Sequence, residues 1–110
     1  MKMIVAMIRP EKLQNAKDAL AEAGAPALTI THVTGRGAQA GMRFTTRVGE
    51  FCVDEIEKIK IEAVVPDKLV EPCIKALRAH VTTGHIGDGR IFVLPVERSI
   101  CIRTGEEGNP

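Results

Sequence analysis

The sequence predicts a single α+β domain in which a long loop joins two β-α-β halves. Two amphipathic helical stripes alternate with four apolar strand patterns, in the order strand, helix, strand and again strand, helix, strand. A length of 110 residues suits one domain, residues 1–110, whose thin core favours association into an oligomer. This element order is typical of the split βαβ, or ferredoxin-like, arrangement βαββαβ.

In the first half, residues 3–8 are apolar on both alternating faces, which predicts a strand that is covered on both sides or lies centrally in its sheet. Arg9 and Pro10 end it, and a helix is expected from Glu11, since Pro10 suits a first helical turn and Gly24 the residue just past the end. The apolar stripe of this helix consists of Leu13, Ala16, Ala19, Leu20 and Ala23.

A second strand is expected over residues 28–33, where threonines alternate with apolar residues, and it should end at Gly35-Arg36-Gly37. Residues 38–54 show no clean period and are interpreted as a long loop. Loops of this length without structure of their own are usually functional or disordered.

In the second half, alternation from residue 56 to 65 predicts a strand with one buried and one polar face. Asp67 can cap a second helix, in which Pro72 requires a late start or a kinked first turn. A strand over 91–94 and a short C-terminal strand over 99–103 complete the domain. The stripe of the second helix is Leu69, Val70, Cys73, Ile74, Leu77 and Val81.

Composition excludes several functions. Fifteen Lys and Arg against 14 Asp and Glu leave a net charge of +1, so bulk attraction to nucleic acid or anionic membranes is not expected. Aromatic residues make up 3%, too few for an RNA-stacking sheet. No apolar run is long enough to span a bilayer, and the N-terminus does not resemble a signal peptide, so we expect a cytoplasmic protein without membrane insertion.

The cysteines and histidines do not form a metal motif. Cys52, Cys73 and Cys101 are odd in number and lack a C-x-x-C pair, which indicates reduced thiols. The histidines at 32, 80 and 85 offer no ligand spacing. No persuasive nucleophile or base is present, which favours a binding protein over an enzyme, although a small metal-binding or catalytic trimer of the same fold remains an alternative.

The strongest local feature is the glycine-rich run from Gly84 to Arg90. Glycines allow backbone N–H groups to approach an anion, and a following arginine adds a forked cationic donor, so the run can bind phosphate. A plain tight turn is the competing interpretation. Arg36, between Gly35 and Gly37, and Arg103 are further candidate phosphate donors, and Lys58 can grip a carboxylate or phosphate or lie on a solvated face.

These motifs carry a resemblance to a known family. The runs T-G-H-I-G-D-G-R-I-F-V at 83–93 and I-R-T-G-E at 102–106, with Arg9-Pro10 upstream, are highly specific in combination. Over residues 1–107 the chain resembles the PII nitrogen-regulatory signal-transduction family. Residues 9–12, 26–29 and 35–37 are more similar to its nitrogenase-associated and divergent branches than to the common one, so a divergent member is expected.

The resemblance implies a homotrimer of ferredoxin-like subunits that binds ATP or ADP in clefts between neighbours. It implies no enzymatic activity and no permanent cofactor. The nucleotide-binding residues expected from the resemblance and from the glycine-rich segments are Thr29, Gly35, Arg36, Gly37, Val64, Gly87, Asp88, Gly89, Arg90 and Arg103.

The resemblance also implies a T-loop, about residues 36–54, that docks on an ammonium transporter or a nitrogen-metabolism enzyme. Gln39 would ligate Mg²⁺ beside the ATP phosphates and, with Lys58 and Gly87, bind 2-oxoglutarate. Arg47 and Phe51 would contact the target.

Departures from the family pattern leave a second hypothesis open. Ala38 and Cys101 stand where many members carry basic residues, and Phe51 and Gly49 remove hydroxyls that others have modified. Losing one or two charged donors could weaken phosphate binding by a decade or more. The alternative is a PII-like sensor of ADP, AMP or another small anion that regulates a transporter or enzyme outside nitrogen assimilation.

Overall fold

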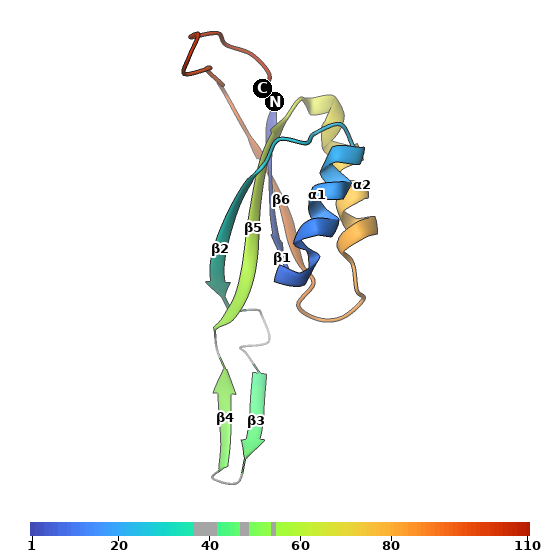
Figure 1. Ribbon diagram of the computed structural model, residues 1–110, viewed down its shortest axis with the longest axis vertical. Helices are drawn as coiled ribbons and strands as arrows, with labels where there is room; N and C mark the ends of the chain where they lie inside the picture. Colours follow the sequence, from blue (N-terminus) through green and yellow to red (C-terminus); the bar gives the residue numbers. More distant parts are fainter. Residues whose placement is uncertain (37–41, 47–48, 54) are drawn as a thin grey trace.

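The described part of the chain forms a four-stranded antiparallel sheet with its two α-helices on one face (Figure 1). The computed structural model describes residues 1–36, 42–46, 49–53 and 55–110. The sheet order is β2-β5-β1-β6, which confirms the predicted ferredoxin-like α+β fold. The elements of this body are β1 (Lys2–Ile8), α1 (Leu13–Glu22), β2 (Thr29–Gly35), β5 (Ile56–Val65), α2 (Val70–Val81) and β6 (Gly89–Pro95).

Strand β1 lies inside the sheet, paired with β5 on one side and β6 on the other. Ile8, its last residue, lies opposite Ile59 of β5 and Gly89 of β6. The helices cover the face of β1 that carries Ile4, Ala6 and Ile8, whereas Met3, Val5 and Met7 lie on the opposite face, which the helices do not cover. The end of β1 therefore brings three distant segments of the chain to one edge of the sheet.

The core lies between the helices and one face of the sheet. Leu20 of α1 and Leu77 of α2 are buried against Ile4, Ile59 and Ile61. Side chains alternate along β5, so that Ile59, Ile61, Ala63 and Val65 are buried while Lys58, Lys60 and Glu62 are on the other face. The predicted stripes and alternation are confirmed because both periodicities face the same core.

Each helix is preceded by a 3-10 turn, η1 (Pro10–Lys12) and η2 (Asp67–Leu69). The α-helical part of α2 begins only at Val70, so Pro72 lies in its first turn, where no intrahelical N–H bond is lost. The expectation that Asp67 caps this helix is wrong. Its carboxylate instead accepts a hydrogen bond from the Met1 ammonium at 2.6 Å. No helix in the described ranges is long and apolar enough to cross a membrane.

The expectation of a loop without structure over 38–54 is also wrong in part. Strands β3 (Met42–Thr46) and β4 (Gly49–Val53) pair antiparallel as a separate two-stranded ribbon that extends beyond the main sheet (Figure 1). Among the described strands, β3 and β4 pair with each other and not with the main sheet. Arg47 and Val48 between the strands also lack the Gly or Asn that usually signals a hairpin.

The short C-terminal strand predicted over 99–103 is not formed. The chain instead folds back on itself after β6, with one isolated bridge between Ile100 and Glu107 and a tight turn in which the Gly105 N–H donates to the Cys101 carbonyl. Arg98 pairs with Glu107 across this fold-back. Gly105, two residues beyond the predicted strand, adopts a φ of 74°, which suits this tight turn.

We expect Leu77→Ala to lower the free energy of unfolding by about 2–5 kcal/mol, because it removes buried methyl groups and leaves a cavity under the sheet. Lys75→Ala, on the exposed side of the same helix, should change it by less than about 0.5 kcal/mol. Urea denaturation at equal protomer concentrations measures both. Equal losses in the two variants would contradict the assigned core.

Candidate anion-binding site

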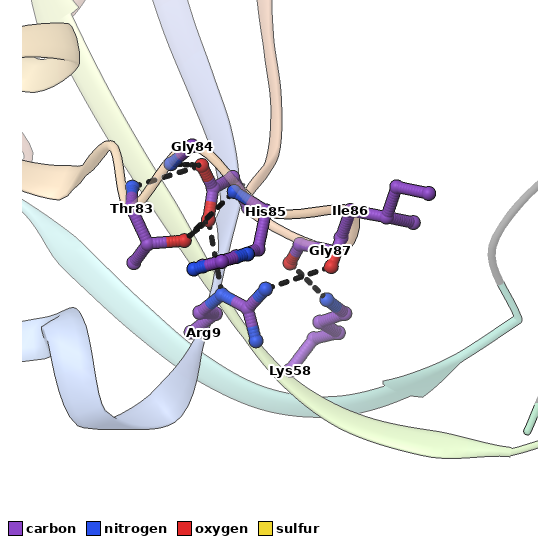
Figure 2. Close-up of polar contacts among 8 residues, drawn as sticks. Arg9, Lys58, Thr83, Gly84, His85, Ile86 and Gly87 are labelled. Carbon is purple, nitrogen blue, oxygen red and sulfur yellow. Dashed lines mark hydrogen bonds and ion pairs between the residues drawn. The ribbon is translucent and has the colours of Figure 1, made fainter.

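The glycine-rich segment forms the connection between α2 and β6, and we refer to residues 83–90 as the 83–90 loop. It lies beside Arg9, which follows β1, and Lys58 of β5 (Figure 2). The position of the loop follows from strand pairing, since Gly89 is held opposite Ile8. Loop, arginine and lysine therefore meet at the end of β1.

The Asp88 carboxylate is bound by four donors within this region. One oxygen accepts the backbone N–H groups of Thr83 and Gly84, each at 2.9 Å. The other accepts the Thr83 hydroxyl and the Arg9 Nε–H, the latter at 3.1 Å. The side chains of Arg9 and Asp88 are 25% and 24% exposed, so this contact is partly shielded from solvent.

These contacts lower the pKa of Asp88 well below its usual range, chiefly through the Thr83 hydroxyl and further through the Thr83 amide, Arg9 and the Gly84 amide. Partial desolvation acts in the opposite direction. The carboxylate is therefore an anion that organises the loop, with its charge balanced by Arg9.

Two loop carbonyls face the neighbouring cations. Arg9 Nη2 donates to the Ile86 carbonyl at 2.7 Å, and Lys58 Nζ donates to the Gly87 carbonyl at 2.7 Å (Figure 2). Lys58 and Gly87, both predicted to bind 2-oxoglutarate, are thus in direct contact. In this state the lysine already has a polar partner, which a carboxylate ligand would have to replace.

Glycine is required at two positions of the loop. A Cβ on Gly89 would lie 1.7 Å from the Met7 carbonyl oxygen, which no side chain can do. Gly87 adopts a φ of 100°, and a Cβ there would lie 3.2 Å from Arg9 Nη2. The motif therefore allows close packing of the loop on β1 as well as a left-handed backbone.

A groove of about 370 Å³ adjoins the loop on the helix side of β6. Asp88, Gly89 and Arg90 line one part of it, and the remainder is lined by Arg78, Thr82 and apolar side chains of α2, β1 and β6. A second hollow of about 320 Å³ lies beside Lys58 and is lined by Pro10, His32, Val33, Thr34 and Glu57. Polar groups of the loop thus border concave surface on which a small molecule could rest.

The other predicted nucleotide residues lie along β2 and β5. Thr29 begins β2, opposite Glu62, whereas Val64 lies opposite Met3 near the far end of β5. Gly35 and the exposed Arg36 are at the other end of β2. Gly37, Gln39 and Arg47 lie outside the described residues. Phe51 lies in β4, opposite Phe44.

Arg103 does not join the loop within one chain. It is exposed in the C-terminal fold-back, which follows the opposite end of β6 from Gly87 and Arg90 (Figure 1). A seven-residue strand separates the two regions by roughly 20 Å. Only a second chain could therefore bring Arg103 to the 83–90 loop.

Cysteine and histidine side chains have other surroundings. Cys73 is buried and free, and burial raises its pKa, whereas Cys101 is exposed and free, and contacts with Thr104 and Arg103 lower its pKa. His80 contacts Glu22 at 2.8 Å and joins α2 to α1. Within the described ranges, no group of three or more His, Cys, Asp and Glu is placed to hold a metal ion.

Sequence reasoning did not assign roles to Arg9 and Thr83, although both occur in the motifs. Arg9 is separated from its partners by 77 and 79 positions, so no local spacing connects them. The ferredoxin-like topology provides the available signal, because it places the end of the first strand beside the start of the last. Thr83 could have been found as a hydroxyl five residues before an aspartate in a glycine-rich turn.

Fold and site together define a small α+β protein with a ferredoxin-like sheet and a glycine-rich loop that forms a candidate anion-binding site. Residues 1–106 match the family model of nitrogen regulatory protein P-II. The chain belongs to this family.

Its relatives match over almost their whole length. The chain is 50% identical to nitrogen regulatory protein P-II of Haemophilus influenzae over 97% of this chain and 96% of the relative. It is 49% identical to nitrogen regulatory protein P-II 1 of Escherichia coli K12, with the same coverage. It is 48% identical to nitrogen regulatory protein GlnK2 of Haloferax mediterranei, over 97% of this chain and 87% of the relative.

We expect Asp88→Asn to destabilise the protein at neutral pH and to make its stability less sensitive to acid. Because the pKa of Asp88 is lowered in the folded state, its contribution is complete above the ordinary value of 3.8 and is lost as pH falls through the lowered pKa. The difference in unfolding free energy between wild type and variant should therefore shrink below that pH.

Denaturant titrations across the acid range measure this difference. Asp18→Asn is the matched control, since its exposed carboxylate contacts the neutral Gln14 side chain at 3.0 Å. A gap between wild type and Asp88→Asn that stays constant into strong acid would show that the carboxylate charge does not hold the loop.

Proposed function

We propose that the protein is a PII-type signal-transduction regulator of nitrogen metabolism that acts as a homotrimer in the cytoplasm. ATP or ADP binds in clefts between subunits, with Mg²⁺ accompanying ATP, and 2-oxoglutarate joins the MgATP-bound state. The T-loop then docks on an ammonium transporter or a nitrogen-metabolism enzyme. The protein is a binder and catalyses no reaction.

The 83–90 loop is the observation that carries this proposal. The loop places Arg90 and Lys58 near the end of β1, and Arg9 balances the charge of Asp88 there. Such an arrangement suits the phosphates of a nucleotide. The negative charge of Asp88 is balanced by Arg9, and its second oxygen is occupied by the Thr83 N–H, which reduces its repulsion of an anion.

The proposed trimer explains two further features. Within one chain, β6 separates Arg103 from the 83–90 loop, because the two lie beyond opposite ends of this strand. A phosphate at the loop would therefore be reached by the Arg103 of another subunit. The sheet face opposite the helices carries Phe92 and Leu94, 48% and 40% exposed, beside Val5 and Met3. An apolar sheet face of this kind favours burial against other copies.

Calorimetric titration with ATP, ADP and AMP, with and without Mg²⁺, tests the nucleotide site. We expect one site per protomer for ATP or ADP, and a mass of three chains by light scattering. Arg90→Ala should weaken ATP binding about tenfold or more through loss of a charged hydrogen bond. Lys75→Ala, an exposed cation on α2 outside the groove, is the control for a lost positive charge. No binding of any nucleotide at millimolar concentration would refute the proposal.

A second titration addresses 2-oxoglutarate. Lys58→Ala and Gln39→Ala should each abolish its binding to the MgATP-saturated protein and retain binding of ADP. Lys60→Ala is the matched control, since Lys60 lies on the same strand and face as Lys58. Its Nζ is 3.9 Å from Glu62 Oε1, whereas Lys58 contacts the loop. Full 2-oxoglutarate affinity in both test variants would refute the assigned residues.

A second candidate function is a PII-like sensor of ADP, AMP or another small anion outside nitrogen assimilation. The exposed, uncharged Cys101 in the C-terminal fold-back favours it, because other members place a basic residue there. The same titrations distinguish the two. AMP affinity equal to or above ATP affinity, with no response to 2-oxoglutarate, would favour the second candidate.

A further inference from the structure

We propose that Arg9 is a positioning residue that presents the Gly87 N–H to a bound anion and keeps the Asp88 carboxylate withdrawn from it. The inference rests on the proposed function, since it concerns the same phosphate-binding loop. It assigns a role to a side chain that the phosphate-donor pattern of the sequence does not include.

The first step of the argument concerns the peptide between Ile86 and Gly87. Its carbonyl accepts a hydrogen bond from Arg9 Nη2 at 2.7 Å. Carbonyl and N–H point in opposite directions across a trans peptide, and no peptide of the described chain is cis. The Gly87 N–H therefore points away from Arg9, and none of the described residues accepts a hydrogen bond from it.

The second step concerns charge. A carboxylate beside an anion-binding backbone would repel phosphate, yet Asp88 lies within the 83–90 loop. Arg9 Nε binds one of its oxygens at 3.1 Å, while the Thr83 and Gly84 amides bind the other at 2.9 Å. Arg9 therefore neutralises the carboxylate and holds it toward the start of the loop.

One guanidinium makes both contacts at once. Nε faces Asp88 and Nη2 faces the Ile86 carbonyl, so the planar fork fixes the carboxylate and the peptide plane relative to each other (Figure 2). A lysine has the same charge but only one nitrogen, and cannot span the two acceptors. Charge and geometry can thus be separated by a single conservative substitution.

The experiment is calorimetric titration of the full-length protein with ADP and, as a ligand without phosphate, adenosine. Arg9→Lys and Arg9→Ala should each weaken ADP binding about tenfold or more and leave adenosine binding unchanged. Arg9→Gln, which is shorter and uncharged but keeps one amide donor group, is a second variant should Arg9→Ala fail to fold. Lys17→Ala, an exposed cation on α1, controls for loss of one positive charge.

A readout without ligand accompanies the titrations. In the free protein, the Gly87 amide resonance should shift in Arg9→Lys, because the 86–87 peptide loses its anchor, and remain in place in Lys17→Ala. In a double-mutant cycle, Arg9→Lys should weaken ADP binding less when Asp88 is already replaced by Asn than when Asp88 is present. The reason is that the two residues act through one contact.

The outcomes separate this inference from the proposed function. Wild-type ADP affinity in Arg9→Lys with loss in Arg9→Ala would overturn it, since charge alone would then suffice. An unshifted Gly87 resonance in Arg9→Lys, or equal losses of ADP and adenosine binding, would also overturn it. If wild type itself bound no nucleotide, the proposed function and this inference would both fall.

Discussion

The double pairing of β1 is the constraint on which the site depends. Ile8 lies opposite one residue of β5 and one residue of β6. The neighbours of those paired positions, Arg9, Lys58 and Asp88, consequently meet at one edge of the sheet. A slip of one residue in either pairing would turn the buried isoleucines away from the helices, so the hydrophobic core holds the register and thereby the site.

Asp88 is an acidic residue within the 83–90 loop, which we propose binds an anion. Asp88 receives more donors than a surface carboxylate normally finds, and its acidity is correspondingly increased. Its charge orders the start of the loop, where the Thr83 and Gly84 N–H groups both donate to it. Close contact between Gly89 and the Met7 carbonyl then ties this ordered loop to β1.

Local sequence patterns predict an element well where that element is buried against the core. The helical stripes and the alternation along β5 have one apolar face each, and both were predictable. Among the described strands, β3 and β4 pair with each other and not with the main sheet. The residues between them lack a Gly or Asn turn signature, so the sequence pattern does not predict this hairpin. The 99–103 segment has a strand-like composition, but in the described part of the chain it makes one isolated bridge and joins no strand. Asp67 accepts a hydrogen bond from the Met1 ammonium and does not cap the helix.

By itself the sequence determined the order of the main-sheet strands and the two helices, their buried faces and a glycine-rich turn before β6. These depend on periodicity and on backbone freedom, which neighbouring residues encode. Only the tertiary structure decided that Arg9 grips Asp88 across 79 positions and that Lys58 meets the Gly87 carbonyl across 29. Contacts over such distances arise from strand order, because antiparallel pairing brings together residues that share no local pattern.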